Sequence, residues 1–329
     1  MKKQSLMART KMGKSIVIFF MLYSFGGMDV GAQTIELVQH DVLTIDSKIK
    51  GDGQVLYVHK PLGYDQEPEK RYPVIYVLDP EERFAHTLMA QEFLSAYVNS
   101  AVPTSIIVGI KSADRYFDFS PKTGNGWTVP AFIKNTGGAE LFRTYLSQEV
   151  IPTIEKKYRT APFRVIVGHS MGGLFALETL LKQPQLFKAY IILDPSTFWN
   201  NGEIVDQFIE QVKNLNISSG RLFLADGLVP ESMEVKLEPN QERLEKYLLT
   251  NFLPNFNFKY LGLRGESHNE MPFQAVYQGL KAVFFDYRVE MPWTLSAQQI
   301  ESYYTALSAK YGYVVEVPAM LKNKGAGRN

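Results

Sequence analysis

The sequence of 329 residues contains no cysteine. This absence excludes disulfide bonds, thiol catalysis, metal sites with cysteine ligands and a lipid-bearing cysteine. A chain without cross-links depends on its buried core, and a hydrophobic content of 45% with 13% aromatic residues is enough to form one. Internal repeats and low-complexity segments are missing as well. We therefore expect a globular domain of ordinary size.

The N-terminal part lacks a hydrophobic run long enough to cross a bilayer. Residues 15–25 form an apolar run of 11 residues, which is too short. Five basic residues and no acidic residue come before this run, and Val30, Gly31 and Ala32 follow it. This order is typical of a secretory signal peptide cleaved after Ala32, and an N-terminal membrane anchor is the alternative. We expect an exported bacterial protein, periplasmic or secreted, with no membrane span after cleavage.

The chain also lacks a surplus of basic charge. Its net charge is +1, and removal of residues 1–32, which hold five basic residues and one acidic residue, leaves −3. Such a balance argues against nucleic acid or anionic lipid as a partner. The H-E-x-x-H motif and other spaced ligand clusters are missing too, so we expect no metal and no other cofactor.

What the chain does have is a series of short apolar runs that alternate with helical patterns. Buried strands are predicted at 73–78, 105–110, 165–167, 189–193, 221–225 and 258–263. Helices are predicted at 84–98, 139–158, 171–182, 241–253, 273–287 and 296–310. Two more strands at 34–45 and 54–58 come first, with a turn at 51–53 between them. This order predicts an α/β fold with a mostly parallel central sheet and helices on both faces.

The most informative motif is Gly168-His169-Ser170-Met171-Gly172, which fits G-x-S-x-G. It stands between the predicted strand at 165–167 and the predicted helix at 171–182, the context of a nucleophile elbow in an α/β-hydrolase fold. Flanking glycines are needed because strand and helix nearly touch at this turn. We predict that Ser170 is the nucleophile and that the His169 side chain points away from the reacting centre.

A serine needs a base, and His268 is the histidine that follows both Ser170 and the last core strand. The order serine, acid, histidine places the acid between these two residues, after the strand that precedes His268. Glu231 is the preferred candidate, Asp226 is the alternative and Asp194 is a weaker third choice. A site with no acid at all also remains open.

Two backbone N–H groups should stabilise the developing oxyanion. The first belongs to Met171, directly after the serine, and the second to the loop that follows an earlier strand. Pro80 has no N–H, so Glu81 is the expected donor. The long segment 111–138 is polar and aromatic and follows a core strand, and we expect it to form a wall of the substrate pocket.

These residues resemble the putative-esterase family of α/β-hydrolases over about residues 36–290. The family includes enterobactin- and salmochelin-type siderophore esterases, feruloyl and acetyl-xylan esterases, and mycolyltransferases, and the siderophore esterase-like branch is the most similar. The resemblance rests on residues 72–79, 108–110 with Arg115 and Pro121, 137–139 with Phe142, 152–160, 168–174, 194–196 with Trp199, and 267–268 leading to 279–280.

The resemblance implies the same roles for Ser170, His268, Met171 and Glu81. Two positions depart from the family pattern, which usually has glycine at Pro80 and serine at Asp194. The second departure places a carboxylate near the site. Some members of this branch act with a serine–histidine dyad, which would make Glu231 dispensable.

The predicted organisation is a signal peptide at 1–32, an α/β-hydrolase domain at 33–290 and a C-terminal helical extension and tail at 291–329. The predicted function is that of an exported serine esterase acting on a siderophore or related ester through an acyl-enzyme. An acyltransferase or a feruloyl or acetyl polysaccharide esterase is the alternative with the same site. A non-catalytic binding protein on a hydrolase scaffold is the alternative from another class. The partner is a small-molecule or glycan ester, and the sequence does not define the oligomeric state.

Overall fold

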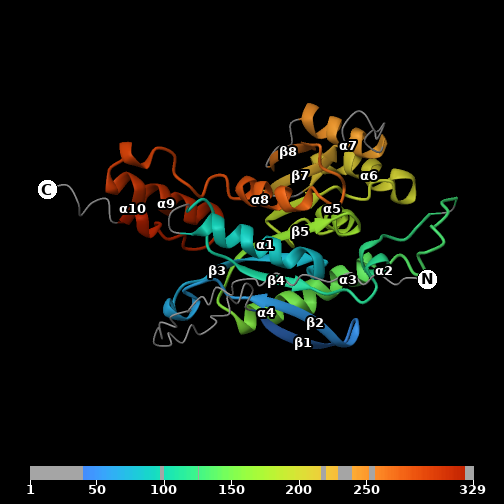
Figure 1. Ribbon diagram of the computed structural model, residues 1–329, viewed down its shortest axis with the longest axis horizontal. Coiled ribbons are helices and arrows are strands. Elements are labelled where there is room, and N and C mark those ends of the chain that lie inside the picture. The colour runs from blue at the N-terminus through green and yellow to red at the C-terminus, as the bar shows by residue number, and fades with distance from the viewer. Residues whose placement is uncertain are drawn as a thin grey trace, which may run out of the picture. The chain divides into compact units, whose positions relative to one another are not determined.

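The computed structural model of the protein describes residues 40–96, 100–124, 126–215, 220–228, 239–251 and 256–322, and within them eight strands form one sheet (Figure 1). The sheet order is β1-β2-β4-β3-β5-β6-β7-β8. The strands are β1 (Asp41–Ser47), β2 (Gly51–His59), β3 (Tyr72–Leu78), β4 (Ile106–Ile110), β5 (Thr160–His169), β6 (Ala189–Leu193), β7 (Gly220–Leu228) and β8 (Phe256–Arg264). The pairs from β4 to β8 are parallel, and β2 is antiparallel to β1 and to β4. The predicted α/β fold with a mostly parallel sheet is confirmed.

Helices cover both faces of this sheet. They are α1 (Pro80–Ser95), α2 (Arg115–Phe119), α3 (Ala139–Tyr145), α4 (Ile151–Lys157), α5 (Met171–Lys182), α6 (Glu203–Gln211), α7 (Pro239–Thr250), α8 (Pro272–Val283), α9 (Ala297–Tyr311) and α10 (Ala319–Lys322). Helices α1 and α8 lie side by side (Figure 1). Their buried residues share one core cluster with those of α9. Buried residues of α3 to α7 belong to the cluster on the opposite face.

Strand β3 shows why the apolar runs have no polar alternation. All seven of its residues are buried. Tyr76 and its even-numbered neighbours pack into the cluster with α3 to α7, whereas Ile75 and Val77 pack into the cluster with α1, α8 and α9. A strand that is buried on both faces has no solvent side, so its sequence reads as a continuous apolar run.

The structure corrects the predicted turn at 51–53 and the predicted start of the first helix at 84. The turn between β1 and β2 lies at 48–50, where Ser47 Oγ accepts hydrogen bonds from the Ile49 and Lys50 N–H groups. Helix α1 begins four residues early, at Pro80. Proline suits the first helical position because the N–H that it lacks would have no partner there.

The predicted helix at 139–158 is divided shortly before Pro152. Helices α3 and α4 are joined by a π-helical turn, Leu146–Val150, in which the Ile151 N–H donates to the Leu146 carbonyl. Pro152 follows at once and has no N–H to continue the α-helical ladder. The segment 111–138, predicted as a loop, contains helix α2, whose first turn is capped by the Asp114 side chain through the Phe117 N–H.

Helix α9 adds buried aromatic residues to the core. The Tyr311 side chain is 2% exposed, its ring stacks on Phe163 with centroids 4.8 Å apart, and its hydroxyl donates to Asp286 Oδ1 at 2.7 Å. Tyr311→Ala should lower the free energy of unfolding by about 3 to 5 kcal/mol, because it leaves a large cavity and removes this hydrogen bond. Urea unfolding measures the change, with exposed Glu301→Ala as the control on the same helix. Equal effects of the two variants would contradict the packing role of α9.

Candidate active site

Ser170 occupies a sharp turn between β5 and α5. Its backbone has φ 58° and ψ −119°, a conformation that is strained for a residue with a side chain. A Cβ atom on Gly168 would collide with the Gly172 backbone, and one on Gly173 would lie 3.0 Å from the Pro195 Cα atom. The turn therefore depends on both glycines, and the structure has the strand–turn–helix context that the motif predicts. The Ser170 Oγ lies 3.3 Å from the Ser196 Oγ.

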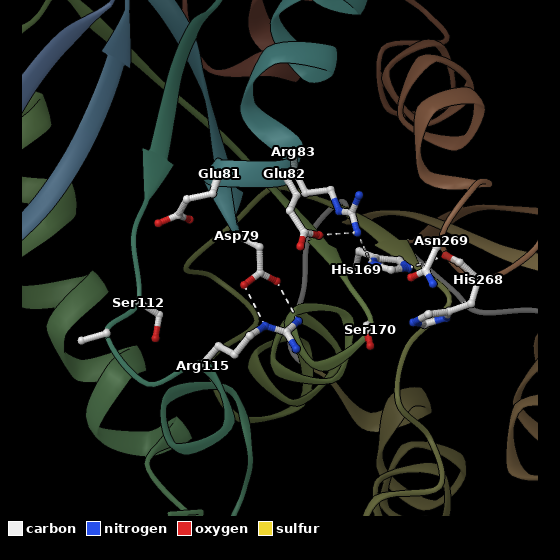
Figure 2. Close-up of a pocket in the computed structure, with 11 residues that line it drawn as sticks. Asp79, Glu81, Glu82, Arg83, Ser112, Arg115, His169, Ser170, His268 and Asn269 are labelled. Carbon is white, nitrogen blue, oxygen red and sulfur yellow. Dashed lines mark hydrogen bonds and ion pairs between the residues drawn. The ribbon is translucent and has the colours of Figure 1, made fainter. Parts of the chain in front are cut away.

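His268 comes from the loop between β8 and α8. Its ring extends toward Ser170 in Figure 2, and its Nδ1 lies 3.0 Å from Asp194 Oδ2. Because Nδ1 faces a carboxylate, it carries the ring proton, and Nε2 is left with a lone pair that can accept a proton. The His268 side chain is 46% exposed and that of Asp194 only 12%, so the carboxylate is shielded while the ring reaches the pocket.

The carboxylate beside His268 is thus that of Asp194, the third choice of acid in the sequence analysis. Asp194 follows β6 with a left-handed φ of 41°, and its N–H donates to the Ala225 carbonyl at 2.7 Å. Burial by itself would raise the pKa of Asp194. Hydrogen bonds from His268 and from Gln241 outweigh burial and hold this pKa below its ordinary value, so the carboxylate stays ionised.

Of the two other candidate acids, the structure describes Asp226, which is not paired with His268. Asp226, the predicted alternative, lies near the end of β7 with no exposed surface, and its Oδ1 accepts a hydrogen bond from Gln241. Glu231, the preferred candidate, lies outside the described residues and stays a prediction. The ends of β6 and β7 are neighbours, so a carboxylate on either strand starts close to the same imidazole.

His169 does not point away from the site, contrary to the prediction. Its Nε2 lies 2.9 Å from the His268 carbonyl oxygen, its Nδ1 lies 2.9 Å from Arg83 Nη2, and its ring centroid is 4.4 Å from that of His268. A guanidinium only donates hydrogen bonds, so Nδ1 must accept and Nε2 must donate to the carbonyl. Val165 and Val167 of β5 pack on the face of α1 and α8, and His169 continues this alternation.

This environment gives the protein a pH-dependent stability. Burial, followed by the charge of Arg83, lowers the pKa of His169 to about 3. The unfolded chain binds this proton at an ordinary pKa of about 6.5 and the folded chain does not, so stability is lost as the pH falls from 6.5 toward 3. The loss from this residue approaches about 1.4 kcal/mol per pH unit. His169→Gln keeps an acceptor and a donor and should weaken the pH dependence of urea unfolding, and an unchanged dependence would contradict this account.

The two predicted oxyanion donors lie at helix starts. Met171 is the first residue of α5 and Glu81 is the second residue of α1. The first N–H groups of a helix have no partner inside the helix and lie at the positive end of its dipole. Both groups are therefore available to an anion. The Glu81 side chain itself turns to Lys111, with Oε1 and Nζ 3.0 Å apart.

Ser170, His268 and His169 line a pocket of about 460 Å³ together with residues of α1 and of the segment 111–138 (Figure 2). It is lined by Asp79, Glu81, Glu82, Arg83, Ser112, Ala113, Arg115, His169, Ser170, His268 and Asn269. The start of segment 111–138 forms one wall, as expected for that part. Charges on the walls are paired. Arg115 binds Asp79 through Nε and Nη2 at 2.9 Å each, and Arg83 lies 3.0 Å from Glu82.

The described residues hold no group of three or more His, Asp or Glu side chains arranged to bind a metal ion. Among the helices of the described chain, none has the length and apolar character that a membrane crossing requires.

Sequence reasoning missed Arg83 and Gln241 and undervalued Asp194. Strands β3, β6 and β7 were predicted, and an aspartate stands at or near the carboxyl end of each of them. This repetition was a signal that more than one carboxylate reaches the site. Gln241 is the third residue of an amphipathic helix and has no motif around it.

The strand order, the turn at Ser170 and the histidine after β8 define an α/β-hydrolase. Residues 47–232 match the model of the family described as "Putative esterase", and because this is more than half of the chain, the protein belongs to that family. The chain is a carboxylic ester hydrolase.

Named relatives agree with this assignment. The chain is 29% identical to the ferri-bacillibactin esterase BesA of Bacillus subtilis over 233 residues, which are 65% of this chain and 78% of the relative. The crystal structure of an IroE-like serine hydrolase from Shewanella oneidensis superposes with a TM-score of 0.74 at 27% identity, covering 86% of this chain and 91% of that one. The BES protein from Bacillus cereus gives a TM-score of 0.66 at 28% identity, with 78% and 99% covered.

Proposed function

We propose that the protein is a serine esterase that forms an acyl-enzyme on Ser170, with His268 as the general base and Asp194 as the acid that orients it. The observation that carries this proposal is the pairing of His268 Nδ1 with Asp194 Oδ2 at 3.0 Å, with the ring extended toward Ser170 (Figure 2). An imidazole held in this tautomer can take the serine proton on Nε2. The strained turn at Ser170 presents the hydroxyl at the edge of the sheet.

The reaction then follows in two halves. Ser170 Oγ attacks the ester carbonyl carbon while its proton passes to His268 Nε2, and the N–H groups of Met171 and Glu81 stabilise the oxyanion. The tetrahedral intermediate collapses, and His268 returns the proton to the departing alcohol. Water attacks the acyl-enzyme with His268 again as the base, which releases the acid and restores Ser170. Asp194 stabilises the imidazolium in both halves.

The substrate that we propose is a siderophore or a related small-molecule ester. The name of the Bacillus subtilis relative, a ferri-bacillibactin esterase, supports this choice. The pocket of about 460 Å³ also has the size of an ordinary small-molecule site. Export is part of the proposal and is supported by the basic residues, the short apolar run and the Val30–Gly31–Ala32 stretch of the N-terminal segment.

A substrate panel tests this proposal. The kcat/KM values for ferric and iron-free catecholate siderophores are compared with those for feruloyl and acetyl sugar esters, and an added alcohol acceptor detects acyl transfer. We expect the siderophore esters to be the best substrates and water to be the acceptor. Preference for sugar esters, or transfer to the alcohol, would instead establish one of the alternative activities. The N-terminal sequence of the mature protein from a bacterial host tests cleavage after Ala32.

A further inference from the structure

The side chain of Gln241 lies between two carboxylates on neighbouring strands. Strands β6 and β7 are paired in register with Leu193 opposite Ala225. Asp194 and Asp226 each follow this pair by one residue, and the Asp194 N–H is bound to the Ala225 carbonyl. The two aspartates therefore stand side by side at the carboxyl edge of the sheet.

One amide nitrogen serves both of them. Gln241 Nε2 donates to Asp194 Oδ1 at 2.5 Å and also to Asp226 Oδ1. A primary amide nitrogen has two hydrogens, so each carboxylate receives one. The opposite orientation of the amide would place its oxygen against two carboxylates and is disfavoured. Gln241 is 5% exposed and Asp226 is 0% exposed, so water has little access to replace these bonds.

The two carboxyl groups differ in charge. Burial raises the pKa of Asp226 to about 7 in spite of the hydrogen bond from Gln241, and the charge of Asp194 adds to the rise. Glu245 of α7 and Tyr260 of β8 also face Asp226, and His268 and His169 face Asp194. Below neutral pH, Asp194 carries the negative charge opposite His268, while Asp226 is mainly neutral and acts as an acceptor for Gln241.

We propose that Gln241 is a positioning residue for ester hydrolysis, which ties Asp194 to the buried Asp226 and so holds the acid in line with His268. The inference rests on the function proposed above. Asp194 lies at a strand end and its own backbone has a strained, positive φ. Its Oδ2 is bound to His268, so a contact at Oδ1 is needed to fix the rotation of the carboxylate. Gln241 supplies that second point, and Asp226 prevents the amide from turning away.

The test uses Gln241→Met, which keeps the length of the side chain and removes both N–H donors. The matched control is Glu242→Met, at the next and exposed position of α7. We expect Gln241→Met to lower kcat by about 10- to 100-fold, because a misplaced catalytic group costs about that much, with KM changed less than threefold. The acid limb of the kcat/KM profile should move to higher pH, since Asp194 without its amide donor attracts the imidazolium proton more strongly.

Two substitutions at Asp226 separate positioning from simple stabilisation. Asp226→Asn keeps an oxygen acceptor and should lower kcat less than Asp226→Leu, which removes it. Melting temperatures are recorded for all variants. A lower melting temperature of Gln241→Met with kcat and the acid limb unchanged would show that Gln241 is only structural and would overturn the inference. Failure of the wild-type protein to react with a serine-directed fluorophosphonate would instead refute the proposed function, so the two failures are distinguishable.

Discussion

Ser170→Ala is expected to abolish labelling by a fluorophosphonate probe and to lower kcat for ester hydrolysis by about 10⁴- to 10⁶-fold. The reason is the loss of the only group that the proposed mechanism acylates. The variant should keep its melting temperature, because the turn is maintained by Gly168 and Gly173. The substitution removes the hydrogen bond between the Ser170 and Ser196 hydroxyls, which is long at 3.3 Å. Steady-state kinetics and mass spectrometry of the labelled protein make the measurement.

The double variant with His268→Ala sharpens this test. Serine and base act as a unit, so His268→Ala should cost about as much as Ser170→Ala, and the double change should add little. His86→Ala is the control, since His86 lies on α1, packed against Phe273, and has no part in the mechanism. Retention of activity within tenfold of the parent in Ser170→Ala would refute the nucleophile, and additive losses would refute the pairing with His268.

Asp194→Asn is expected to lower kcat by about 10³- to 10⁴-fold with a small change in KM. An amide at this position no longer favours the tautomer with the proton on Nδ1, so Nε2 of His268 loses its lone pair in much of the population. It also removes the negative charge that stabilises the imidazolium. Steady-state kinetics across a pH series measure the effect.

Glu231→Gln is the matched comparison for Asp194→Asn. If Asp194 is the acid, Glu231→Gln should leave kcat within about threefold, because one carboxylate suffices to orient the ring. A loss at Glu231 as large as that expected at Asp194 would move the acid to the segment after β7. Full activity of both variants would show that the enzyme acts with a serine–histidine dyad.

The fold could be predicted from the sequence because its strongest signal is repeated. Strands β3, β4 and β6 are buried along their whole length and therefore apolar throughout, and helical patterns separate them in the sequence. Errors occurred where local chemistry decides a boundary. Pro80 is expected in the loop after a strand but is a favourable first residue of α1. Gly51 and Gly53 are expected in a turn but belong to β2, with positive φ.

The candidate site was predictable as far as sequence order determines it. Ser170 follows from its motif, and His268 follows from its place after the last core strand. The acid does not, because strands β6 and β7 are neighbours about 5 Å apart and an aspartate stands near the end of both. Asp194 is the one that pairs with His268, and Gln241, which binds both carboxylates, belongs to a helix that the chain reaches later. His169 shows the same limit, since its partner Arg83 comes from a helix 86 residues earlier.

The paired charges on the pocket wall bear on how a substrate arrives. On the wall, Arg115 is paired with Asp79 and Arg83 with Glu82. Glu81 of the wall is paired with Lys111, the residue before Ser112. The fields of opposite charges in such pairs cancel a short distance outside the pocket. Such an entrance provides little electrostatic steering, and the association rate of a charged ester should depend only weakly on ionic strength. The association rate is then set by diffusion and by how well the shape of the ester matches the pocket. An anionic ester can form an ion pair with Arg83 or Arg115 only after it has entered the pocket. There it must compete with the carboxylate that the arginine already binds.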